Sequence, residues 1–135
     1  RFYKTWSDWE IIVNNTSDTG WQNLTLANGV VPYNTTSTPK YRLINDRGMI
    51  ELSLMGTVKN IKSVKTIIAT LPSNIAAQLK RPIPYVQNCS IKNDIATTTR
   101  MVIETNGDIS MQNVSFANSL MSETDWYPID ITIRL

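Results

Sequence analysis

Apolar and polar residues alternate most clearly between Tyr41 and Val58. Apolar side chains occupy every second position from Ile50 to Leu54 and recur at Val58. A period of two places successive side chains on opposite faces of a strand, so one face of this segment is apolar. The preceding Asn45–Gly48 segment combines turn-forming Asn and Asp with a Gly that allows positive φ. The pattern predicts a β-hairpin.

A second hairpin is predicted from Thr98 to Val114, with Asn106-Gly107 at its tip. A two-residue loop there would set Ile103 opposite Ser110 and Val102 opposite Met111. Both faces of this hairpin would then carry apolar groups, and the second face would need a partner. A loop with one extra bulge residue would change this register.

The remaining periodic segments are short, and most of them indicate strands. We expect strands at Trp21–Leu26, with Trp21 facing inward, at Val64–Leu71 and at the C-terminal Pro128–Leu135, which alternates without error. Ser73–Arg81 is the only segment with helical character, and it could equally form a compact turn after a proline.

These elements predict an all-β fold. Turn signals recur about every 8–12 residues, and no helix is long enough to cross between parallel strands. We therefore expect an antiparallel β-sandwich of jelly-roll type, with a barrel as the alternative. Residues 1–14 are predicted to be the end of a preceding module or a linker, and residues 15–135 to form the sandwich domain.

Composition narrows the possible functions. Charged residues make up 18% of the chain and the net charge is +2, which does not indicate nucleic-acid binding. Lys59, Lys62 and Lys65 are expected to lie on a solvated loop. No apolar run has membrane-spanning length, so membrane insertion is not expected. The single cysteine, Cys89, is expected to pack as a small hydrophobic residue.

The chemical inventory favours binding over catalysis. The chain has no histidine, which removes Ser-His-Asp and Cys-His catalysis and the usual zinc ligands. Asp94 with Asp108, or Asp125 with Asp130, could form a carboxylate pair only by tertiary contact. We therefore predict a protein that is not an enzyme and that needs no cofactor or metal.

A binding surface is predicted at strand ends and loops, where aromatic rings can stack on a sugar and polar groups can bond its hydroxyls. The candidate ligand-binding residues are Tyr33, Asn34, Tyr41, Arg42, Asp125 and Trp126. For each aromatic residue the alternative is that it caps one end of the core. Tyr33, on a Pro/Thr/Ser-rich loop, is the best candidate for exposure.

Several motifs together resemble a known group of viral proteins. The motifs are WQNLTLANG at 21–29, YRLIN at 41–45, GMIEL at 48–52, GTVK at 56–59 and ATLP at 69–72. In this order they resemble the C-terminal domains of baseplate and tail-fibre proteins of siphophages that infect Gram-positive bacteria. These include the upper baseplate and receptor-binding protein families. TWSDWE at 5–10 is similar to the closing strand of knob-like repeats upstream in such fibres.

The resemblance implies a homotrimeric jelly-roll head on the virion, outside the host cell. In receptor-binding members the ligand is a cell-wall polysaccharide or teichoic acid. In upper-baseplate members the domain docks another baseplate protein, which is the alternative function here. A three-fold interface would bury the second face of two-faced strands. Met49 and Met55 lie on the outer face of the first hairpin. If they are solvent-exposed, the domain is a simple sandwich; if they meet their symmetry mates, this hairpin forms the trimer contact.

Overall fold

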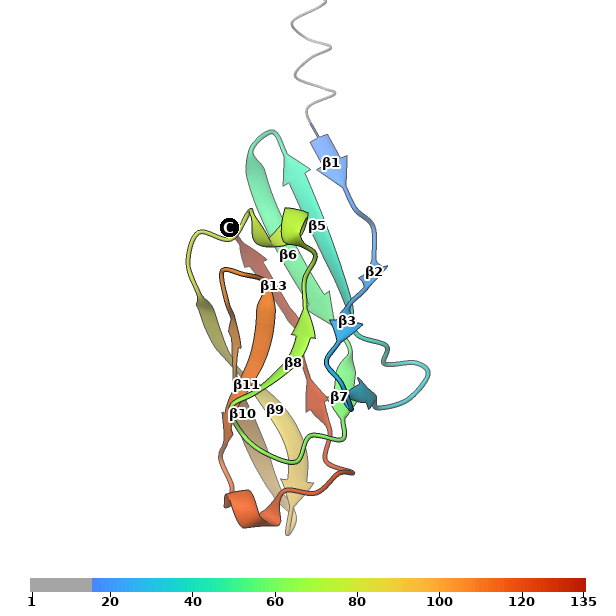
Figure 1. The fold of residues 1–135 in the computed structure, drawn as a ribbon, viewed down its shortest axis with the longest axis vertical. Coiled ribbons are helices and arrows are strands. Elements are labelled where there is room, and N and C mark those ends of the chain that lie inside the picture. The colour runs from blue at the N-terminus through green and yellow to red at the C-terminus, as the bar shows by residue number, and fades with distance from the viewer. Residues whose placement is uncertain (1–15) are drawn as a thin grey trace, which may run out of the picture.

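The computed structural model describes residues 16–135, so the predicted module end or linker at residues 1–14 lies outside the described residues. The described chain is elongated and almost entirely β (Figure 1). Its strands are β1 (Thr16–Asp18), β2 (Gln22–Asn23), β3 (Thr25–Leu26), β4 (Val31–Pro32), β5 (Lys40–Asp46), β6 (Met49–Met55), β7 (Thr57–Lys59), β8 (Thr66–Thr70), β9 (Ile83–Lys92), β10 (Ile95–Ile103), β11 (Asp108–Val114), β12 (Tyr127–Pro128) and β13 (Ile131–Arg134).

These strands form three antiparallel sheets. One sheet has the order β1-β5-β6-β13, with β2 also paired to β5, and we call it the β5–β6 sheet. A second has the order β3-β8-β11-β10-β9, and we call it the β10–β11 sheet. In this sheet β8 lies beside β11 of the β9–β10–β11 meander, which is a Greek-key connection. A small sheet, β12-β7-β4, links the two layers. The predicted all-β sandwich is confirmed.

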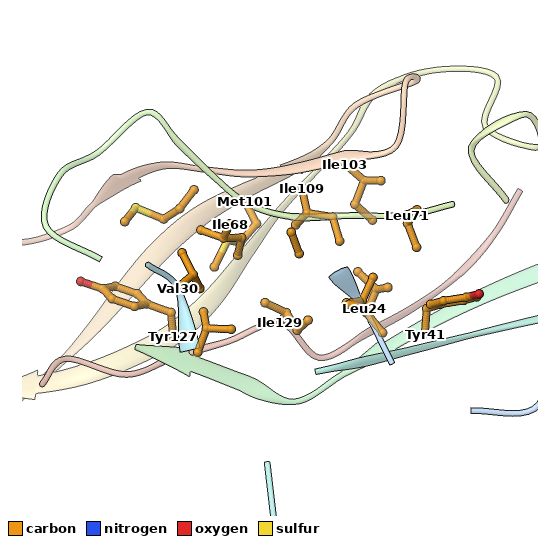
Figure 2. Close-up of a cluster of buried hydrophobic side chains, with 14 of the residues drawn as sticks. Leu24, Val30, Tyr41, Ile68, Leu71, Met101, Ile103, Ile109, Tyr127 and Ile129 are labelled. Carbon is orange, nitrogen blue, oxygen red and sulfur yellow. The ribbon is translucent and has the colours of Figure 1, made fainter. Parts of the chain in front are cut away.

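The core lies between the β5–β6 sheet and the β10–β11 sheet (Figure 2). Leu52 and Leu54 face inward from β6, and Met101, Ile103 and Ile109 face inward from β10 and β11; all five side chains are buried. Burying apolar side chains of this size contributes about 1.5–3 kcal/mol each relative to exposure, so these alternating positions stabilise the sandwich.

The first predicted hairpin is confirmed, with Asp46 paired to Met49 across a two-residue turn. Arg47 and Gly48 both have positive φ, at 55° and 90°, as a type I′ turn requires. The strand then breaks at Gly56, whose φ is +118°. A Cβ atom there would lie 2.5 Å from the Cα atom of Pro39. The close approach of Gly56 to Pro39 separates β6 from β7, and the chain passes here from the β5–β6 sheet into the small sheet.

Near its turn the second hairpin has the longer loop that was the alternative, so the register predicted for a two-residue loop is wrong there. Ile103 pairs with Ile109, and Glu104 donates its N–H to Asp108 O at 2.8 Å, around a three-residue loop. Gly107 ends that loop with a φ of +97°. The extra residue gathers Ile103 and Ile109 on the buried face. Ile103 and Ile109 therefore need no partner on the outer face of the hairpin.

Three other predictions are corrected in detail. Trp21 was predicted to face inward but is 41% exposed, because the chain passes between the sheets at Leu24, which is buried instead. The helical segment is only one turn, α2 (Ser73–Ala76), and a short 3-10 helix, η1 (Asn118–Leu120), was not foreseen. The C-terminal segment divides into β12 and β13, which pair with different sheets.

The outer edge of β9 is partly covered by residues 126–130, which include β12 and the segment that joins it to β13. Ser90 donates its backbone N–H to Trp126 O at 3.2 Å, and the Gln87 side chain donates to Asp130 O. Tyr85 donates its hydroxyl to Ile129 O at 3.3 Å. Pro84, nearer the start of the strand, has no N–H to offer. The edge of the longest strand of the sandwich is therefore partly covered.

Candidate functional site

Two of the predicted site residues, Tyr33 and Trp126, lie next to the outer face of the small sheet. Val31 pairs with Lys59, and Pro32 and Tyr127 both pair with Val58. Val58 and Tyr127 are fully buried, so alternation turns Val31 and Lys59 outward. The same register, continued by one residue, sets half-exposed Trp126 beside Lys59.

Tyr33 extends this surface at the end of β4. Its ring is 39% exposed, and Lys59 Nζ lies 5.8 Å from the ring centroid. A cation over an exposed ring contributes about 0.5–1 kcal/mol, which is enough to favour one ring orientation. Tyr33 N–H donates to Thr57 O at 2.8 Å, which fixes the start of the loop to β7. The predicted exposure of Tyr33 is confirmed. We call the surface formed by Val31, Tyr33, Lys59 and Trp126 the small-sheet surface.

Asn34 shapes the loop next to this surface. Its Oδ1 accepts hydrogen bonds from the Thr36 backbone N–H at 3.1 Å and from Thr36 Oγ1 at 2.9 Å. Ser37 O accepts from Thr57 N–H at 2.9 Å and closes the loop onto β7. The side-chain oxygen of Asn34 is thus used in the turn. The side chain is exposed, and its amide nitrogen is available to a ligand.

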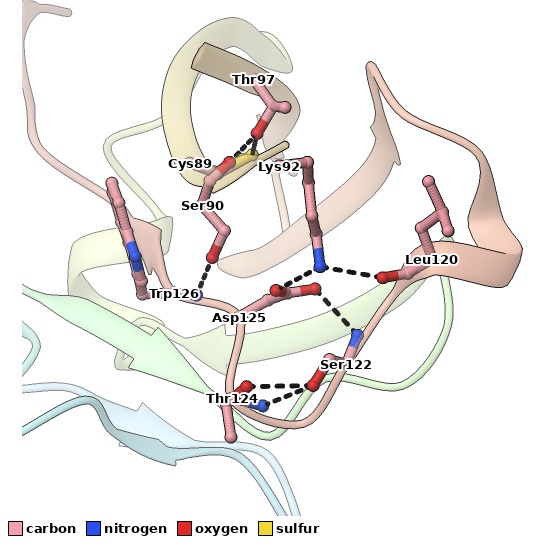
Figure 3. Close-up of polar contacts among 9 residues, drawn as sticks. All are labelled: Cys89, Ser90, Lys92, Thr97, Leu120, Ser122, Thr124, Asp125 and Trp126. Atoms are coloured by element: carbon pink, nitrogen blue, oxygen red, sulfur yellow. Dashed lines mark hydrogen bonds and ion pairs between the residues drawn. The ribbon is translucent and has the colours of Figure 1, made fainter. Parts of the chain in front are cut away.

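Asp125 lies just behind Trp126 and is occupied by protein contacts (Figure 3). It is 5% exposed, its Oδ1 is 2.7 Å from Lys92 Nζ, and its Oδ2 accepts the Ser122 N–H at 2.8 Å. Lys92 Nζ also donates to Leu120 O at 2.8 Å. This cluster anchors the 115–126 segment to the end of β9, and it engages both carboxylate oxygens of the buried Asp125.

Tyr41 and Arg42 lie away from the small-sheet surface. Tyr41 is 8% exposed and belongs to the core, because it pairs with inward-facing Leu54, so its prediction as a ligand-binding residue is wrong. Arg42 points outward from the β5–β6 sheet, where its Nε donates to Asp18 Oδ1 at 2.9 Å. The hydrogen bond from Arg42 lowers the pKa of Asp18 to about 2. The structure therefore places Tyr33, Asn34 and Trp126 around the small sheet, with Asp125 buried next to Trp126, and separates them from Tyr41 and Arg42.

Two lysines organise this region, and neither is among the predicted site residues. Lys59 was treated as part of a solvated loop, although it follows Val58 on a strand whose alternation would have turned it outward. Lys92 had no such signal, because its partner Asp125 is 33 residues away in the chain and meets it only in the folded state.

The thiol of Cys89 is buried. Cys89 is 2% exposed, its Sγ is 3.1 Å from Thr97 Oγ1, and burial raises the pKa of its thiol. The prediction that it packs as a small hydrophobic residue is confirmed. Among residues 16–135, no group of three His, Cys, Asp or Glu side chains is placed to hold a metal ion.

Comparison with known proteins gives one structural match. The crystal structure of the receptor binding protein gp15 of Listeria phage PSA aligns with 98% of this chain and 74% of that chain, with a TM-score of 0.67 and 19% sequence identity. This chain has the fold of that receptor binding protein. No protein-family model matches the chain, and a search of curated proteins finds no match either. The fold implied by the sequence motifs is thereby confirmed.

Proposed function

We propose that this chain is a virion domain of a phage tail or baseplate that binds a saccharide on the surface of its host. The observation that carries the proposal is the shared fold, which extends over 98% of the chain and aligns it with a phage receptor binding protein. Fold alone does not fix function, so the proposal depends equally on a surface with suitable chemistry.

The small-sheet surface has that chemistry. Tyr33 offers an exposed ring for stacking, and Lys59 and Asn34 offer donors for hydroxyl groups beside it. The two aromatic residues flank a short sheet whose inward-facing Val58 and Tyr127 are fully buried, which fixes the backbone on which the surface is built. A rigid aromatic platform with adaptable polar neighbours is a general solution for binding polar ligands. The proposed ligand is a neutral or weakly charged host polysaccharide.

The test is binding of the chain to purified host cell walls and to a glycan array. Tyr33→Ala removes the exposed ring and is expected to weaken binding about tenfold, corresponding to loss of about 1.4 kcal/mol of stacking energy. Trp21→Ala is the matched control, because Trp21 is comparably exposed but lies just before β2, which pairs with β5 in the other sheet.

Two results would count against the proposal. Equal loss of binding in both variants would place the contact elsewhere or show a general effect of lost aromatic surface. No binding to walls or glycans, together with tight capture by a neighbouring baseplate protein, would favour the alternative structural role.

The proposed role is binding and not catalysis. The sequence contains no histidine, and Asp125, which precedes Trp126, is held by Lys92 and the Ser122 N–H. We place the domain on the virion, outside the cell. Within residues 16–135, no helix has the length and apolar character needed to cross a membrane.

We propose further that the domain assembles as a homotrimer, because apolar side chains remain exposed on the outer face of the β5–β6 sheet. Met49 is 55% exposed and Met55 37% in the single chain. An oligomer interface would cover such residues. Size-exclusion chromatography with light scattering checks this: a single species of three times 15.3 kDa is expected, and a stable monomer at micromolar concentration would contradict it.

A further inference from the structure

A hollow of about 510 Å³ opens on the outer face of the β10–β11 sheet, where the loop before β8 and the helix η1 flank β11. Its size falls within the range of about 300–1,000 Å³ typical of small-molecule sites. The polar side chains lining it are Lys65, Arg100, Ser110, Gln112, Asn113 and Asn118.

A β-bulge explains why so many polar groups share this hollow. Arg100 pairs with Asn113, but the next residue, Met101, pairs with Met111, so Gln112 is an extra residue in β11. Met111 is fully buried and Val114 packs against the core, while Gln112 and Asn113 both line the hollow. Regular alternation would have turned one of these two amides inward. Bulges re-aim side chains in this way and are frequent next to binding sites.

The two cations of the hollow are unpaired within residues 16–135. The ion pairs of that part of the chain involve Arg42, Arg47, Lys62 and Lys92, and not Lys65 or Arg100. No carboxylate lines the hollow. Lys65 has a φ of +59°, a conformation that is costly for a residue with a side chain, and it is held at the rim in this backbone state.

The neutral polar groups of the hollow are also unoccupied. Across residues 16–135, the side chains of Ser110, Gln112, Asn113 and Asn118 make no hydrogen bond to protein groups, unlike Asn34 and Asn106, whose amides shape turns. Amides and a hydroxyl match the hydroxyl groups of a carbohydrate, and two cations match an oxyanion.

We propose that this hollow binds an oxyanion carried on a polyhydroxylated chain, such as a sugar phosphate or a uronate. Lys65 and Arg100 hold the anion, and Gln112, Asn113 and Asn118 bond the neighbouring hydroxyl groups. The site lies on the β10–β11 sheet and shares no residue with the small-sheet surface. It therefore stands independently of the function proposed above.

The test is a titration of the chain with glucose 6-phosphate, glucuronate and glucose, followed by amide chemical shifts in NMR. The two anions are expected to shift the amide signals of β10, β11 and η1 at millimolar concentrations, and glucose to do so at least about tenfold more weakly, because charge-assisted hydrogen bonds are the stronger ones. Tighter binding of glucose 6-phosphate would identify a phosphate ligand, and tighter binding of glucuronate a carboxylate ligand.

Variants assign the shifts to the hollow. Lys65→Gln and Arg100→Gln are each expected to weaken anion binding about tenfold, the size of one lost charge-assisted bond. Lys62→Gln is the matched control, because Lys62 lies on the same loop but its Nζ is 3.0 Å from Glu123 Oε1. Equal affinity for glucose and its anions, or anion binding unchanged in the Lys65 and Arg100 variants, would overturn the proposal. Binding that persists in Tyr33→Ala separates this site from the small-sheet surface.

Discussion

The ion pair between Lys92 and Asp125 is the contact whose removal should cost most among the polar contacts near the small-sheet surface. Lys92 Nζ also donates to Leu120 O and lies 5.0 Å from the centroid of the Phe116 ring, and Asp125 also accepts from the Ser122 N–H. Two substitutions of similar shape, Lys92→Met and Asp125→Asn, each leave one charge in place without its partner. The 115–126 segment should therefore lose its attachment to β9.

The expected cost follows from the geometry. At 2.7 Å and an effective dielectric constant of about 20, the attraction of the two charges is about 6 kcal/mol before desolvation. The side chains are only 20% and 7% exposed, so desolvation of several kcal/mol per ion offsets much of this. Removing one partner is expected to lower the free energy of unfolding by about 2 kcal/mol, below the 3–5 kcal/mol of fully buried pairs. For 135 residues this lowers the melting midpoint by about 7 °C.

Urea denaturation followed by circular dichroism and tryptophan fluorescence measures this free energy, and the double variant completes a double-mutant cycle. A coupling energy of about 1–2 kcal/mol is expected, because the two groups are in direct contact. Lys62→Met is the control: the Lys62–Glu123 pair is 69% and 62% exposed, and its loss should change stability by less than about 0.5 kcal/mol. Single variants that are as mild as this control, or that add without coupling, would refute the reasoning.

Three further perturbations test other parts of the structure. Gly56→Ala should cost about 3 kcal/mol in chemical denaturation, from a backbone clash and a positive φ, whereas Gly29→Ala, with open space around it, should cost about 1 kcal/mol; equal costs would contradict the clash. Tyr127→Phe should leave thermal stability unchanged or raise it by about 1 kcal/mol, because the buried hydroxyl has no partner in residues 16–135; a clear loss would reveal a missed bond. The pKa of Asp18, followed by carboxyl NMR, should be about 2 and return toward 3.8 in Arg42→Gln. Because the folded pKa is the lower one, the stabilisation by Asp18 is present above about pH 4 and lost as the pH falls to about 2.

The hairpins show what sequence pattern could predict. Asn45–Gly48 with strong alternation on its C-terminal side gave the first hairpin, because a two-residue type I′ turn leaves one register. Asn106-Gly107 gave the second hairpin but not its register, since the same dipeptide serves loops of two or three residues. The three-residue loop shifts the pairs nearest the turn by one position, and the bulge at Gln112 restores the predicted register from Arg100 and Asn113 onward. The shift places Ile109 and not Ser110 opposite Ile103.

The candidate site was only partly predictable for the same reason. The register of the first hairpin, once fixed, sets Tyr41 opposite Leu54, so the sequence did contain the signal that Tyr41 is inward. The position of Trp21 could not be read in this way, because alternation fails where a chain crosses from one sheet to another. The contact between Lys92 and Asp125 depends on tertiary packing and leaves no periodic trace.

The covered edge of β9 has a consequence for crowded assemblies. An open edge strand of ten residues would offer a row of N–H and C=O groups to any other chain nearby. Here Pro84 removes a donor, and residues 126–130 engage the Gln87 side chain and the Ser90 N–H. This cover reduces the backbone pairing that copies of the domain held side by side at high local concentration can make through β9. Contacts between copies are left to the side chains of the sheet faces, where they can be specific and reversible.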